Sequence, residues 1–90
     1  MTDPVAQRLV SVLRRSQLAA LALVAQGKSN KDIAGRINRS QGTVRNNMLD
    51  IYDQTGMGSR LELAMFVHAH PQLRDAANAA LVEINDTHRA

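Results

Sequence analysis

The fold of this 90-residue chain is decided by residues 29–47, which read SNKDIAGRINRSQGTVRNN. Apolar side chains at Ile33 and Ile37 predict one short helix, and Val44 starts a second apolar series at helical spacing. The polar run 38–40 between them predicts a tight corner. Two short helices joined in this way are typical of a helix-turn-helix, in which one helix braces the phosphate backbone of DNA and the next enters the major groove.

Serine residues mark where these two helices should begin. Ser29 followed by Asp32 predicts a shortened capping box at the start of the first helix. Ser40 is placed to cap the second helix, which we expect to cover about residues 41–55 and to end at Gly56. The second helix is therefore the expected recognition helix.

The rest of the chain also reads as helices. Pro4 and Pro71 suit the first turn of a helix, and Ser16 and Ser59 are placed to cap two others. The first two segments can alternatively run together as one long helix, because nothing between Arg14 and Gln17 forbids it. The expected helices cover residues 4–13, 17–26, 60–70 and about 71–86.

The composition favours packed helices in a cytoplasmic protein. Tyr52 and Phe66 are the only aromatic residues, so Leu, Ile, Val, Met and Ala must form the core. The chain has no cysteine, which excludes disulfides and thiolate metal sites and fits a reducing compartment. No apolar run approaches the roughly 18 residues of a membrane span, and the N-terminus lacks the features of a signal peptide. We expect an all-α protein without a membrane segment.

The charge is distributed unevenly along the chain, although the net charge is only +3. Residues 1–49 carry eight cations against two acids, whereas residues 50–90 carry three cations against six acids. This asymmetry indicates a surface that faces a polyanion, and two ordinary solvated faces would be the alternative explanation.

No constellation of residues indicates catalysis or a metal. Asp50 and Asp53 lie one helical turn apart, but no nucleophile, histidine partner or glycine-rich phosphate loop accompanies them. His68 and His70 are two residues apart, which places them on different faces of a helix. Two histidines that bind one metal ion from a helix are usually four residues apart. We expect no enzymatic activity, no metal and no cofactor.

With these elements in place, the stretch over about residues 13–70 resembles the LuxR/GerE-type DNA-binding domain of bacterial transcription regulators. The resemblance implies a four-helix core whose third helix reads DNA and whose fourth often mediates dimerisation. Extra helical segments at 4–13 and 71–86 would complete a single domain over residues 1–90. The matching residues are Leu23, Val24, Ala25, Gln26, Gly27, Lys28, Ser29, Asn30, Lys31, Asp32, Ile33, Ala34, Ser40, Thr43, Val44, Ile51, Gly56, Ser59, Arg60, Glu62 and Ala64.

The resemblance also implies which residues meet DNA. The helix after Ser29 would direct its N-terminus at a phosphate, with Lys31 adding positive charge. Arg45 can bond guanine bidentately, and Asn46 can do the same with adenine. Each such contact discriminates against a wrong base by about 1–3 kcal/mol. Asn47 stands where the family usually has histidine and can donate to a phosphate. The implied DNA-binding set is Ser29, Asn30, Lys31, Gln41, Thr43, Arg45, Asn46 and Asn47.

The chain departs from the family pattern at Asp50, Asp53 and Gln54, where family members usually carry Asn, Arg or Lys. Carboxylates near a duplex repel it, and the missing cation at position 54 removes a phosphate contact. These departures predict weaker and less salt-dependent DNA binding than in a typical member. The usual Thr-x-x-Glu opening of the first core helix is also replaced, by Arg-Arg-Ser-Gln at residues 14–17.

The helix over residues 60–70 carries apolar side chains on more than one face. If the last helix leaves them uncovered, the exposed patch predicts a twofold homodimer. Two half-sites along one duplex would then add their affinities. The residues expected to mediate dimerisation are Leu61, Met65, Phe66 and His68.

The favoured function is sequence-specific binding of double-stranded DNA for transcriptional regulation, with a regulatory protein as a further partner. The main alternative is a protein-interaction module whose acidic recognition helix docks on polymerase or on another regulator. A sigma-factor-like promoter-reading domain shares the architecture but not the matches at residues 29–34 and 59–60. A purely structural oligomerisation domain would not need the cations between Lys28 and Arg45.

Overall fold

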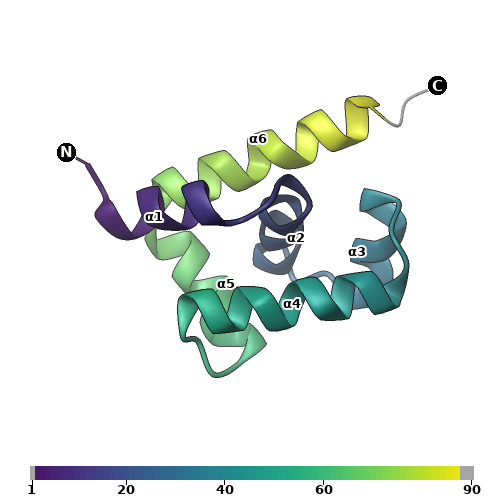
Figure 1. Cartoon of the computed structure of the whole chain (residues 1–90), viewed down its shortest axis with the longest axis horizontal. Coiled ribbons are helices and arrows are strands. Elements are labelled where there is room, and N and C mark those ends of the chain that lie inside the picture. Colours follow the sequence, from purple (N-terminus) through teal and green to yellow (C-terminus); the bar gives the residue numbers. More distant parts are fainter. Residues whose placement is uncertain (1, 88–90) are drawn as a thin grey trace.

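Six α-helices and no strand make up residues 2–87, the part of the chain that the computed structural model describes (Figure 1). The all-α prediction is confirmed. Arg89, counted above among the C-terminal cations, lies outside the described residues. Within these residues no helix combines the length and apolar character needed to cross a membrane. The helices are α1 (Pro4–Val12), α2 (Arg15–Ala25), α3 (Asn30–Ile37), α4 (Gln41–Thr55), α5 (Arg60–Ala69) and α6 (Pro71–Thr87).

Helix α2 lies at the centre of the fold because its sequence is apolar on every side. All residues from Gln17 to Val24 are buried, and α3, α4, α5 and α6 each contact this helix (Figure 1). A helix that is apolar all round must be covered all round. The alanines between Leu18 and Leu21 are buried as fully as the two leucines, since α6 adds a further neighbour to α2.

The helices at the two ends of the chain belong to the same hydrophobic core. Leu73, Ala77 and Ala80 are spaced by four and three residues on α6 and are fully buried. Ala6 and Leu9 are fully buried on α1, which packs beside α6 (Figure 1). The α3–α4 unit is therefore held by a core to which both ends of the chain contribute.

Asp3 ties the start of α1 to the junction of α5 and α6. Its Oδ1 accepts the N–H groups of Val5 at 3.1 Å and Ala6 at 3.2 Å, which caps α1. His70 donates from Nδ1 to Asp3 Oδ2 at 2.6 Å. The hydrogen bond from His70, assisted by the N–H of Ala6, lowers the pKa of the Asp3 carboxyl from its ordinary value. The ionised form of this cap is thereby favoured.

Helices α1 and α2 are separate, and α2 begins earlier than predicted. Leu13 and Arg14 have extended backbone, which excludes the alternative of one long helix. Helix α2 starts at Arg15, so the prediction that Ser16 caps a helix from residue 17 was wrong. Gln17 Oε1 accepts the N–H of Arg14 at 2.9 Å, and this satisfies the donor that the glutamate of a capping box would bind.

Helices α3 and α4 form the helix-turn-helix, and its corner depends on Asn38. This residue has φ 58° and ψ 50°, a left-handed conformation that asparagine tolerates better than most residues. Ser29 Oγ accepts the N–H of Asp32 at 3.2 Å, and Ser40 Oγ accepts that of Thr43 at 3.1 Å. Both predicted helix caps are therefore confirmed.

Candidate nucleic-acid interface

The start of α3 is open to an anion. Ser29 Oγ occupies the N–H of Asp32, while the N–H groups of Asn30 and Lys31 have no partner within the helix. Ser29 and Lys31 are exposed, whereas Asn30 is half-buried. The free N–H groups, the positive end of the helix dipole and the Lys31 ammonium together make this helix start suitable for a phosphate.

Arg60 holds the α3 start in place, a role that the sequence did not reveal. It donates from Nη1 to Asn30 Oδ1 at 2.8 Å and from Nη2 to the carbonyl oxygen of Lys28 at 2.7 Å. These charge-assisted bonds connect the first turn of α5 to the turn before α3. The sequence signals were the family match at Ser59 and Arg60 and a cation placed directly after a helix cap, and neither connects Arg60 to α3.

The first half of α4 presents polar side chains outward. Arg45 and Asn46 are exposed, as are Gln41 and Thr43 in the first turn. Ser40 donates its hydroxyl hydrogen to Thr43 Oγ1 at 3.0 Å, which leaves the Thr43 hydroxyl hydrogen free to donate elsewhere. Four of the predicted site residues therefore lie together on the half of the helix that contacts base edges in helix-turn-helix proteins.

Asn47 does not join this outward set. Its side chain is only 4% exposed and is buried with Val44 and Met48, at the border between the inward and outward faces of α4. Arg14 donates from Nη2 to Asn47 Oδ1 at 3.4 Å, and Nδ2 has no hydrogen-bond partner among the described residues. The predicted donation from Asn47 to a phosphate is not available in this arrangement, because the surrounding core shields the amide.

Two of the three departures from the family pattern contact the N-terminal segment of the same chain. Asp50 Oδ2 accepts from Gln17 Nε2 at 3.2 Å and lies 3.6 Å from Arg14 Nη2. Arg8 donates from Nη2 to the carbonyl oxygen of Gln54 at 2.7 Å and from Nη1 to its Oε1 at 3.4 Å. Sequence reasoning assigned neither Arg8 nor Arg14 to the recognition helix, since nothing local in the chain connects them to it.

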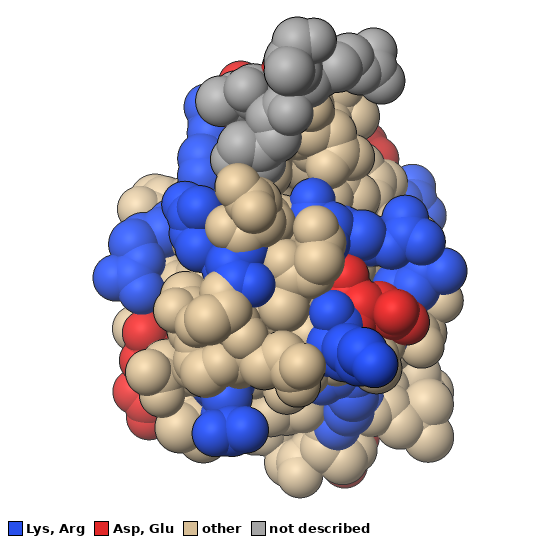
Figure 2. All heavy atoms as spheres, turned by 90° about the vertical axis from the view of Figure 1, so that its right-hand side faces the viewer, with Lys and Arg blue, Asp and Glu red and all other residues tan. Residues whose placement is uncertain are grey.

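Basic side chains surround the helix-turn-helix. Asp32 is the only acid between positions 28 and 45, and the five cations of that range form no ion pair with a described residue. Figure 2 faces the end of the molecule where α3 and the start of α4 lie, and Lys and Arg cover more of it than Asp and Glu. Asp53 is exposed further along α4. The five cations are Lys28, Lys31, Arg36, Arg39 and Arg45.

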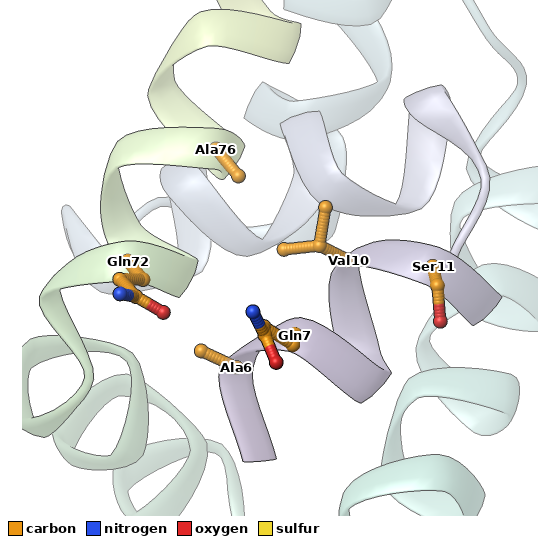
Figure 3. A pocket seen from close by; sticks show the side chains of 6 residues that line it. All are labelled: Ala6, Gln7, Val10, Ser11, Gln72 and Ala76. Atoms are coloured by element: carbon orange, nitrogen blue, oxygen red, sulfur yellow. The ribbon is translucent and has the colours of Figure 1, made fainter. Parts of the chain in front are cut away.

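A shallow groove between α1 and α6 is chemically unlike this interface (Figure 3). It has a volume of about 460 Å³ and is lined by apolar Ala6, Val10 and Ala76, with the amides of Gln7 and Gln72 from the two helices. No charged side chain lines it, so it offers no ion pair to a phosphate. In the described part of the chain no three His, Asp or Glu side chains gather to hold a metal ion.

The predicted dimerisation residues of α5 fall into two groups. Leu61 is 71% exposed and Met65 is 62% exposed, and their spacing of four places them on one face. Phe66 is half-buried against the core, and His68 Nε2 lies 3.0 Å from the carbonyl oxygen of Ala25. The uncovered apolar face of α5 therefore consists of Leu61 and Met65, whereas the other two residues contact their own chain.

The fold and this cationic surface define a helix-turn-helix protein. A sequence model of the GerE family, described as bacterial regulatory proteins of the luxR family, matches residues 11–67. The match contains all of α2, α3 and α4 and spans more than half of the chain, and the chain belongs to this family. Family membership indicates a DNA-binding regulator of transcription, and α6 lies outside the match. Comparisons with curated proteins and with solved structures found no match.

Proposed function

We propose that this protein binds double-stranded DNA sequence-specifically and thereby regulates transcription, with α4 in the major groove. The observation that carries the proposal is the exposure of Arg45 and Asn46 on the first half of α4, a helix that packs against α3 with its open start. At such positions arginine can bond guanine bidentately, and asparagine can bond adenine in the same way. The exposed cations of α3 and of the corner supply the non-specific attraction to the duplex.

The remaining polar groups have positioning roles in this proposal. The N–H groups at the start of α3, together with Ser29, Asn30 and Lys31, hold one phosphate and set the orientation of the domain. Gln41 and Thr43 contact the backbone or base edges at the start of α4. Phosphate contacts of this kind fix the register of the protein on DNA but carry no sequence information.

The test is selection of bound duplexes from a random pool, followed by titration of the selected duplex at several salt concentrations. We expect the selection to enrich one sequence. The logarithm of its binding constant should fall linearly with the logarithm of the salt concentration, because Lys and Arg contacts release counterions from the DNA. A selection that enriches no sequence, together with no duplex binding at low salt, would contradict the proposed function.

We further propose that the protein binds DNA as a homodimer through the α5 face of Leu61 and Met65. Replacing Leu61 with aspartate should weaken the dimer by at least tenfold in sedimentation experiments, because a buried unpaired carboxylate is costly. The fold should be unchanged, since Leu61 is 71% exposed. Val82→Asp on α6 is the matched control, because Val82 is also exposed, at 57%. If the two variants dimerise equally well, α5 is not part of the dimer interface.

The protein-interaction alternative retains support from two residues on the outward side of α4. Leu49 is 62% exposed and Asp53 is exposed, and neither is typical of a surface that faces DNA. Asp50 and Gln54, two of the departures from the family pattern, are instead engaged by Gln17 and Arg8 of the same chain. An α4 that binds a protein partner predicts that Leu49→Ala weakens partner binding and leaves duplex binding intact.

A further inference from the structure

Arg14 lies beside the recognition helix although it belongs to the segment that precedes α2. Its Nη2 lies 3.4 Å from Asn47 Oδ1 and 3.6 Å from Asp50 Oδ2, and its side chain is 69% exposed. Both contacts use the same nitrogen, so the donors on Nη1 and Nε remain available. The guanidinium therefore covers one edge of α4 while still offering hydrogen bonds to a ligand from solvent.

The position of that edge follows from helix geometry. Successive residues of an α-helix are separated by about 100°, so Arg45 and Asn47 lie on opposite sides of Asn46. Asn46 is exposed, whereas Asn47 is buried and accepts a hydrogen bond from Arg14. A helix in the major groove, which is about 12 Å wide, has a phosphate backbone on each side. Arg14 therefore stands at the edge of α4 that Arg45 does not reach.

We propose that Arg14 is a phosphate contact for the DNA strand on the side of α4 opposite to Arg45. The proposal rests on the proposed function. Asn47, Asp50 and Gln54 share this edge at spacings of three and four, and none of them is a cation. Arg14, which precedes α2, thus supplies the positive charge that the recognition helix lacks at this edge. Its contacts with Asn47 and Asp50 hold it there.

The ion pair with Asp50 leaves Arg14 free to bind a phosphate. The two groups are 3.6 Å apart with side chains 69% and 60% exposed, and such pairs are weak and screened by salt. Hydrogen bonds from a guanidinium to a phosphate are shorter and can be bidentate. Gln17 Nε2 also donates to Asp50 Oδ2 at 3.2 Å, so Asp50 keeps a partner when Arg14 contacts DNA.

The test measures the salt dependence of duplex binding by Arg14→Met, which removes the charge and keeps much of the apolar stem. Arg15→Met is the matched control, because Arg15 is the next residue and its Nε lies 2.7 Å from Glu83 Oε2 on α6. We expect the slope of log K against log salt to fall by about 0.9 for R14M and to stay unchanged for R15M. A selected and a random duplex should lose affinity by the same factor, since phosphates are the same in both. Arg14→Lys should keep the wild-type slope.

Three results would overturn the assignment. Equal slopes for R14M and R15M, with wild-type binding intact, would remove Arg14 from the interface and leave the proposed function standing. A loss confined to the selected duplex would make Arg14 a contact to bases rather than to phosphates. No duplex binding by the wild-type protein would overturn the proposed function and this inference together. If thermal melting shows that R14M does not fold, Arg14→Gln takes its place in the same comparison.

Discussion

Replacing Leu73 with alanine should lower the free energy of unfolding by about 2–5 kcal/mol. Leu73 is fully buried on α6, in the same hydrophobic core as the central helix α2. Removal of its side chain loses apolar burial and leaves a cavity that neighbouring helices close only in part. The total stability of a small domain is about 5–15 kcal/mol, so urea-induced unfolding should show the loss clearly.

Val82→Ala is the control for this prediction. Val82 lies on the same helix but is 57% exposed, so its truncation should change the free energy of unfolding by less than about 0.5 kcal/mol. A loss in Leu73→Ala no larger than in Val82→Ala would mean that α6 unfolds independently of the rest. The two variants together therefore measure whether the C-terminal helix is energetically part of the fold.

Replacing Arg45 with alanine should weaken binding to the selected duplex by about 1–3 kcal/mol, which is roughly 5- to 150-fold. The guanidinium is proposed to bond a guanine bidentately, and alanine leaves both acceptors of that base unpaired. Binding to a random duplex should fall much less, and the selected sequence should become less restricted at one position. Titrations of both duplexes at one salt concentration measure the difference.

Arg74→Ala is the control for charge alone. Arg74 lies on α6, outside the helix-turn-helix, and its Nε is 3.7 Å from Asp75 Oδ1. Its replacement removes one positive charge from the protein and should leave the preference for the selected duplex unchanged. Equal losses on selected and random duplexes in Arg45→Ala would instead assign Arg45 to the phosphate backbone.

The features that the sequence predicted well are those decided within a few residues. Ser29, Ser40 and Ser59 cap the helices as expected, because each Oγ accepts an N–H only three residues further on. The prediction for Ser16 was wrong for a related reason. Gln17 can accept the N–H of Arg14 with its own side chain, so the helix starts before the serine.

The outward face of α4 could be predicted only in part. Arg45 and Asn46 are exposed as expected, whereas Asn47 is buried and Asp50 contacts Arg14, the residue before α2. The spacing of apolar residues located the core side of α4, but Asn47 lies at the border between the two faces. Which way such a border residue faces depends on what packs there.

The sequence by itself determined that this protein is a helix-turn-helix of the luxR family, because caps, helical periodicity and the family's residues are all local patterns. The tertiary structure decided which polar side chains of the recognition helix remain available to DNA. Arg14 contacts a residue 33 positions away and Arg8 one 46 positions away. Contacts over such separations form only when the helices pack, and no local pattern in the chain encodes them.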